Sequence, residues 1–236
     1  MTRNDVRDEL VALRDEAAAL LEAYLSRPVL RGISHLVGAF TAAIAGLILV
    51  LQASGTLQLV ASVVYGLGLT LALTTSALYH RIRWRPRAYV RIRKLDHSMI
   101  FVLIASSCTP FALLAVHGNW RIAAVAMIWT LAIAGIAVRC SFESLPRWLL
   151  VSLYLGMGWS GLSLMPALKD MSPTAFTLTC VGAALYTLGA LVYLTKRPNP
   201  IPRWFGFHEV FHGFVVAAAA CHFIAVWPLV TATPGA

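Results

Sequence analysis

The chain has 236 residues, of which 59% are hydrophobic and only 12% charged, and it carries a formal net charge of +9. A mean hydropathy of +0.75 excludes an ordinary soluble domain and indicates a polytopic helical membrane protein. The apolar runs are continuous rather than alternating, which excludes the sequence pattern of a membrane β-barrel.

The first predicted element is an amphipathic helix over residues 4–26. Apolar residues recur there at intervals of four and three, with acids and arginines between them. These apolar residues are Val6, Leu10, Leu13, Ala17, Leu20 and Tyr24. We expect this cytoplasmic segment, residues 1–27, to lie on the membrane surface or to pack against the bundle or a partner. Residues 28–236 are predicted to form one membrane domain.

Seven apolar stretches follow, each close to the ~20 residues that a helix needs to cross a bilayer. They cover residues 32–51, 57–79, 97–116, 120–138, 148–166, 174–195 and 207–229. Seven spans place 17 of the 19 Lys and Arg residues on one side, which the positive-inside rule assigns to the cytoplasm. The sequence therefore predicts an all-α seven-helix bundle in the inner (plasma) membrane, with a cytoplasmic N-terminus and an external C-terminus.

The net positive charge follows mainly from this topology. The most basic stretch, Arg81–Lys94, connects two predicted spans, so we expect it to meet anionic lipid headgroups rather than nucleic acid. The four cysteines lack CxxC spacing, and we expect no structural disulfide among them. They are Cys108, Cys140, Cys180 and Cys221.

Polar side chains gather at the predicted cytoplasmic ends of three spans. His208 and His212 stand four residues apart at the start of the last span and therefore share one helix face. His80 ends the second span at the same membrane level. Polar rings at this depth are costly unless they bind or react with something. Because zinc favours imidazole nitrogens and a catalytic site uses three protein ligands, these histidines predict a zinc site.

Two further polar residues reach the same level. Ser76 lies one turn before His80, and Asp96 opens the third span. Asp96 is a candidate to orient a ligand or to deprotonate the metal's water, and Ser76 to hydrogen-bond that water or Asp96. Each residue also has a simpler interpretation. Asp96 could be an interfacial carboxylate or helix N-cap, Ser76 could bond a backbone carbonyl of its own helix, and His80 could contact lipid headgroups.

Other polar residues leave alternatives open. His208, Glu209 and His212 match the H-E-x-x-H pattern of zinc proteases, in which the glutamate is the general base. No third ligand follows at metzincin spacing, and the alternative interpretation of Glu209 is a first-turn acid favoured by the helix dipole. His222 lies about 15 Å beyond His212 along a helix, so we expect it to hydrogen-bond across the bundle or to line a cavity. His35, near the start of the first span, is a candidate to contact a ligand.

Several of these residues belong to motifs that resemble the bacterial hemolysin III proteins. Those proteins are part of the progestin and adipoQ receptor family, which includes the adiponectin receptors. The similar stretches, in chain order, are Arg27–Gly32 with His35, Ser76–Arg81, Lys94–Phe101, Thr109–Phe111 and Phe207–His212 with Cys221–Phe223. The resemblance covers nearly the whole chain after about residue 27.

The resemblance implies a seven-helix bundle with a cytoplasmic N-terminus and a zinc ion near the cytoplasmic side. By this resemblance the zinc ligands fall on His80, His208 and His212, the motif aspartate on Asp96 and the motif serine on Ser76.

The residues and the resemblance together predict a zinc hydrolase that acts on a lipid amide, such as a ceramide-like molecule, held between the helices. Asp96 would accept a proton from the activated water and pass it to the leaving amine, while Ser76 steadies the intermediate's oxygen. One alternative is a non-enzymatic sensor of membrane homeostasis, or a receptor, with a structural zinc. Another is a pore-forming hemolysin, which the nearly apolar outer halves of the spans disfavour.

Overall fold

The computed structural model of the chain describes residues 5–7, 11, 14, 28–142, 144–164, 168 and 171–232. The predicted amphipathic helix over residues 4–26 lies outside these residues except at five positions, each of which is helical. Its packing and its role therefore stay predictions.

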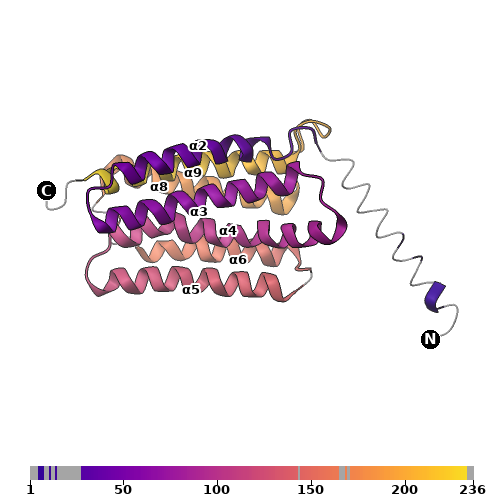
Figure 1. Cartoon of the computed structure of the whole chain (residues 1–236), viewed down its shortest axis with the longest axis horizontal. Helices are drawn as coiled ribbons and strands as arrows, with labels where there is room; N and C mark the ends of the chain where they lie inside the picture. Colours follow the sequence, from indigo (N-terminus) through magenta and orange to yellow (C-terminus); the bar gives the residue numbers. More distant parts are fainter. Residues whose placement is uncertain are drawn as a thin grey trace.

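The described residues form a bundle of α-helices whose long axes run side by side (Figure 1). The helices are α2 (Ile33–Leu51), α3 (Thr56–Arg81), α4 (Pro86–Leu114), α5 (Asn119–Ser141), α6 (Arg147–Ser160), α8 (Pro173–Thr195) and α9 (Phe207–Thr231), with a short 3-10 helix η1 (Gly161–Leu164). Across the described ranges the extended structure amounts to one isolated bridge between Ile201 and Phe205. The all-α prediction is confirmed.

Six of these helices are long and apolar enough to cross a membrane, namely α2, α3, α4, α5, α8 and α9. The predicted span at 148–166 corresponds to α6, which has only 14 residues before the chain tightens into η1. At ~1.5 Å per residue, α6 extends about 21 Å, less than the ~30 Å hydrocarbon core. It nevertheless lies within the bundle and contacts α4, α5 and α8 (Figure 1). The seven-span count and the membrane orientation therefore stay predictions.

The last helix packs among the first ones. α9 pairs with α8 and also contacts α2, α3 and α4, whereas α5 lies at the opposite edge of the bundle from α2 (Figure 1). α2 and α3 approach closely at Gly46 and Gly66, where a Cβ atom added to either would lie 3.0 or 3.1 Å from the other's Cα. Small residues at such crossings let membrane helices pack backbone against backbone. This packing brings the start of α9 next to the end of α3.

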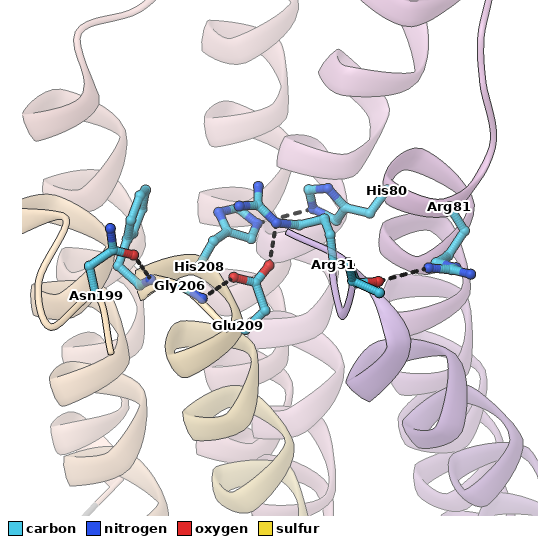
Figure 2. A network of polar contacts seen from close by, with 9 residues as sticks. Arg31, His80, Arg81, Asn199, Gly206, His208 and Glu209 are labelled. Carbon is cyan, nitrogen blue, oxygen red and sulfur yellow. Dashed lines mark hydrogen bonds and ion pairs between the residues drawn. The ribbon is translucent and has the colours of Figure 1, made fainter. Parts of the chain in front are cut away.

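The segments that lead into α2 and α9 are joined by hydrogen bonds. Val29 N donates to Arg203 O over 3.1 Å, and Leu30 N donates to Trp204 O over 3.3 Å. Arg81, the last residue of α3, donates from Nη1 to Val29 O over 3.3 Å (Figure 2). The starts of α2 and α9 and the end of α3 are thereby fixed relative to one another, at the end of the bundle where the predicted metal ligands lie.

Candidate metal centre

His80, His208 and His212 lie together at this end of the bundle. Each offers one ring nitrogen, and these nitrogens all lie within 4.8 Å of one another. The Nε2 atoms of His80 and His208 are 3.1 Å apart (Figure 2). The ring centroids are separated by 4.7 Å for His80–His208, 5.0 Å for His80–His212 and 4.5 Å for His208–His212. Two helices remote in sequence, α3 and α9, therefore converge on one imidazole cluster.

The donor set fits a divalent metal ion that prefers nitrogen. Two imidazole nitrogens on one tetrahedral zinc ion would lie about 3.4 Å apart. The 3.1 Å between the His80 and His208 nitrogens is close to that value. Nδ1 of His212 is buried and has no hydrogen-bond partner among the described residues, which is costly for a polar atom unless it binds something. These three histidines are thus able to hold an ion, and imidazole suits zinc among several transition metals.

A fourth histidine supports the cluster. The ring of His35, on α2, stacks on the ring of His212 with centroids 3.6 Å apart and an interplanar angle of 9°. His35 is buried, and neither of its ring nitrogens has a hydrogen-bond partner in the described part of the chain. The stack restricts the plane of the His212 ring. His35 therefore contacts a candidate ligand, as its place near the start of the first span suggested.

Glu209 stabilises the start of α9. One carboxylate oxygen accepts a hydrogen bond from Gly206 N over 2.8 Å, and the other pairs with Nε of Arg31 (Figure 2). Asn199 adds a second cap, because its Oδ1 accepts from Phe207 N over 3.1 Å. Glu209 is therefore the first-turn acid that the sequence suggested. The contacts of both carboxylate oxygens favour this helix-capping role over that of the general base of a zinc protease.

Sequence reasoning missed the Arg31–Glu209 pair, because the two residues stand 178 positions apart and no local pattern links them. It also missed the role of Gly32. This residue has a φ of +79°, and a Cβ atom added there would lie 2.7 Å from Cβ of His80. Only glycine satisfies both the backbone conformation and the close contact with a candidate ligand.

Asp96 and Ser76 lie beside the histidines. Both residues line one cavity together with His208 and His212. Ser76 also lies near enough to the Asp96 carboxyl group to interact with it, which is one of the contacts considered for Ser76. The structure thus brings all five predicted site residues to one end of the bundle, and the catalytic roles of Asp96 and Ser76 stay predictions.

His97 faces the interior of the bundle. Its Nδ1 lies 3.3 Å from Nε of Arg139 on α5, and the residue lines the cavity. Arg139 is only 2% exposed, so its guanidinium depends on protein acceptors, which also include Phe142 O at 3.2 Å. The need to satisfy a buried arginine explains why His97 faces the protein.

The cavity measures about 240 Å³ and runs from the histidine cluster to His222. His222 lies ten residues beyond His212 on α9, which corresponds to about 15 Å along the helix. Most of the wall is apolar, with contributions from α4, α6, α8 and α9 that include Leu103, Phe111, Leu150, Leu155 and Val215. The 3-10 turn after α6 also contributes, through Gly161 and Leu164. One end of the cavity is therefore polar, and most of the remaining wall is apolar.

Comparison with known proteins identifies the family of the chain. The family described as Haemolysin-III related matches residues 23–223. The chain belongs to the hemolysin III family. This hemolysin III protein is 32% identical to Hemolysin-3 of Bacillus cereus over 217 residues, which cover 89% of this chain and 95% of that protein.

Two further relatives define the breadth of the similarity. The Hemolysin-3 homolog of Bacillus subtilis (strain 168) is 31% identical over 172 residues, or 72% of this chain and 76% of the relative. Monocyte to macrophage differentiation factor of Homo sapiens is 25% identical over 182 residues, or 72% of this chain and 71% of the human protein. The resemblance to the bacterial hemolysin III proteins, which the sequence motifs predicted, is therefore confirmed.

Proposed function

We propose that this hemolysin III protein is a zinc-dependent hydrolase of a lipid amide with ceramide-like chemistry. The shared cavity supports this function most directly. His208, His212, Asp96 and Ser76 line one end of it, and apolar side chains line most of the remainder. Mostly apolar pockets with a few convergent polar groups are typical of small-molecule sites. The acyl chain of the substrate lies along the apolar walls, and its amide bond faces the histidines.

The proposed chemistry assigns one role to each polar residue. His80, His208 and His212 hold the ion. When bound, zinc supplies a Lewis acid that polarises the amide carbonyl and lowers the pKa of a nearby water. Asp96 takes a proton from the attacking water and delivers it to the amine nitrogen as the C–N bond breaks. Ser76, which lies near the Asp96 carboxyl group, donates a hydrogen bond to the substrate oxygen. The products are a fatty acid and a free amine.

Three features of the surroundings favour this assignment. The Arg31–Glu209 pair and the His35 stack restrain α9 and the ring of His212, so the ligands are held before the substrate binds. The apolar walls exclude bulk water, which strengthens electrostatic interactions at the reacting atoms.

We further propose that this end of the bundle faces the cytoplasm and that the protein resides in the inner (plasma) membrane, because the basic residues cluster at the same end.

The proposal is tested by hydrolysis of a fluorescent short-chain ceramide by purified, zinc-loaded protein in lipid nanodiscs. Asp96→Asn keeps the size of the side chain but removes the base, so we expect turnover to fall by ~10²-fold or more. His80→Ala should lose both zinc and turnover. His117→Ala is the matched control, because His117 is exposed and lies outside the cavity and the cluster. Unchanged hydrolysis in Asp96→Asn would rule out the assigned base.

A second candidate function is a membrane sensor or receptor in which zinc is structural. The candidate ligands come from two helices, the end of α3 and the start of α9. An ion bound by them would hold these two helices together, which favours a structural role. In that case zinc removal lowers the thermal midpoint, and no lipid amide is cleaved by the wild type. Pore formation, suggested by the name of the Bacillus relatives, has less support because the cavity walls are mainly apolar.

A further inference from the structure

A second polar cluster lies at the other end of the same cavity. His222 on α9 and Tyr186 on α8 both line the cavity there. His222 stands about 15 Å from His212 along α9. Ionisable side chains at such depth in a membrane helix are costly and usually have a function. The hydrolysis proposed above uses neither residue, so their placement needs its own explanation.

The hydrogen bond of His222 defines which of its nitrogens carries the proton. Nε2 lies 3.2 Å from the backbone oxygen of Thr179. A carbonyl oxygen only accepts, so Nε2 is the protonated nitrogen and donates. In a neutral imidazole the other nitrogen, Nδ1, is then an acceptor. Nδ1 of His222 is buried and has no hydrogen-bond partner within the described ranges. His222, which lines this end of the cavity, therefore carries an acceptor without a donor among the described residues.

Tyr186 presents a second unsatisfied group beside this acceptor. Its ring meets the His222 ring edge to face, with centroids 5.5 Å apart and an interplanar angle of 69°. Its hydroxyl is buried and forms no hydrogen bond with good geometry to the residues that the structure describes. Ser107 on α4 is near enough to interact with this phenol but does not meet hydrogen-bonding geometry. A phenol donor and an imidazole acceptor thus lie at one end of the cavity.

The His222 ring is held in place. A Cβ atom added to Gly182 would lie 2.3 Å from Cδ2 of His222, so the ring packs directly against the backbone of α8. Phe111 contacts the ring from α4, with centroids 6.0 Å apart. With Thr179 holding Nε2 as well, the ring is not free to turn Nδ1 toward another protein group. The unsatisfied acceptor is a fixed feature of the cavity.

We propose that His222 and Tyr186 form a subsite for a hydroxyl group carried on the chain of the lipid bound in the cavity. A hydroxyl is the smallest group that can donate to Nδ1 of His222 and accept from the phenol of Tyr186 at once. Carboxylate and ether oxygens cannot donate to Nδ1. This inference rests on the proposed function for the orientation of the lipid, with its head at the histidine cluster. It adds a substrate class, lipids with a hydroxylated chain.

The test measures binding of saturated fatty acids of ten to sixteen carbons, each with and without an ω-hydroxyl group, to zinc-loaded protein in nanodiscs. The ratio of the two affinities is compared among the wild type, Tyr186→Phe and His222→Leu, because the comparison cancels the different partitioning of the two acids into lipid. His117→Leu is the control variant. One net hydrogen bond corresponds to about a fivefold to tenfold preference.

At one chain length, the ratio of the affinity for the hydroxylated acid to that for the plain acid should be about fivefold to tenfold higher in the wild type and in His117→Leu than in Tyr186→Phe and His222→Leu. Tyr186→Phe is nearly isosteric and keeps the comparison valid if His222→Leu does not fold. The same ratio in all proteins at every chain length overturns the subsite, while binding of the plain acids still supports the acyl cavity. Absence of binding by either acid overturns both the subsite and the proposed function.

Discussion

Replacing Glu209 by Gln tests how the metal-binding end of α9 is held. The substitution keeps an oxygen that can accept from Gly206 N, but it removes the charge that pairs with Arg31. Glu209 is only 3% exposed, so its charge is stabilised by these two groups rather than by water. Glu209→Ala removes the acceptor as well, so the pair of variants separates the ion pair from the helix cap.

The structure gives the expected magnitudes. Breaking a fully buried ion pair from one side costs about 3–5 kcal/mol. The Arg31 side chain is 18% exposed, so solvent offsets part of that cost, and we expect Glu209→Gln to lose about 2 kcal/mol of stability. Glu209→Ala should lose about 1 kcal/mol more, because the cap on the first turn of α9 is also removed.

The assay combines thermal unfolding of the zinc-loaded protein in detergent with zinc affinity, measured by competition with a chromophoric chelator. The thermal midpoint should fall in Glu209→Gln and fall further in Glu209→Ala. Zinc affinity should weaken by about tenfold, because His208 lies in the first turn of α9, which loses its support, and His212 follows in the next turn. Arg31→Gln should destabilise the protein by a similar amount to Glu209→Gln. The double variant should lose less stability than the sum of the two single losses, because both remove the same ion pair.

The decisive comparison is made at saturating zinc. Glu209 acts on the helix and not on the substrate, so excess zinc should restore ceramide hydrolysis in Glu209→Gln to nearly the wild-type rate. A loss of ~10²-fold in turnover at saturating zinc, with an unchanged thermal midpoint, would refute this reasoning. That result would make Glu209 a general base, as the H-E-x-x-H pattern implies.

Three further predictions follow from the same geometry. Gly32→Ala should cost about 1–2 kcal/mol of stability from the left-handed backbone alone, and it should also weaken zinc binding by displacing His80, which chelator competition measures. His35→Phe should retain zinc affinity because it keeps the stack on His212, whereas His35→Ala should weaken it by up to about tenfold; equal affinities in the two variants would show that the stack has no role. Chelation should lower the thermal midpoint reversibly, and zinc at ~100 times its dissociation constant should restore about 2.7 kcal/mol of stability. A midpoint that does not respond to chelator or zinc would contradict specific metal binding.

The histidine cluster could be predicted from sequence because it depends on two simple regularities. The spacing of His208 and His212 places them on one helix face, and the distribution of Lys and Arg places His80 at the same end of the bundle. The placement of Asp96 and Ser76 at this end of the bundle could be predicted from the same topology. Composition alone also indicated a helical membrane bundle.

The remaining features depend on tertiary packing. Hydropathy marked residues 148–166 as a full span, but the chain leaves the α-helix at Ser160 and tightens into the 3-10 helix that helps to line the cavity. Nothing local to Arg31 or Glu209 indicates that they pair, since helix packing alone brings them together. Likewise, the contact of His97 arises from Arg139, a buried cation on another helix.

Metal analysis of the purified protein is the most direct test, because everything proposed for this cavity depends on an ion held by imidazole. Elemental mass spectrometry should find one zinc ion per chain in the wild type, close to none in His80→Ala, His208→Ala or His212→Ala, and an unchanged content in His117→Ala. Zinc that persists at the wild-type level after replacement of all three clustered histidines, in a protein that remains folded, would contradict the assigned metal centre.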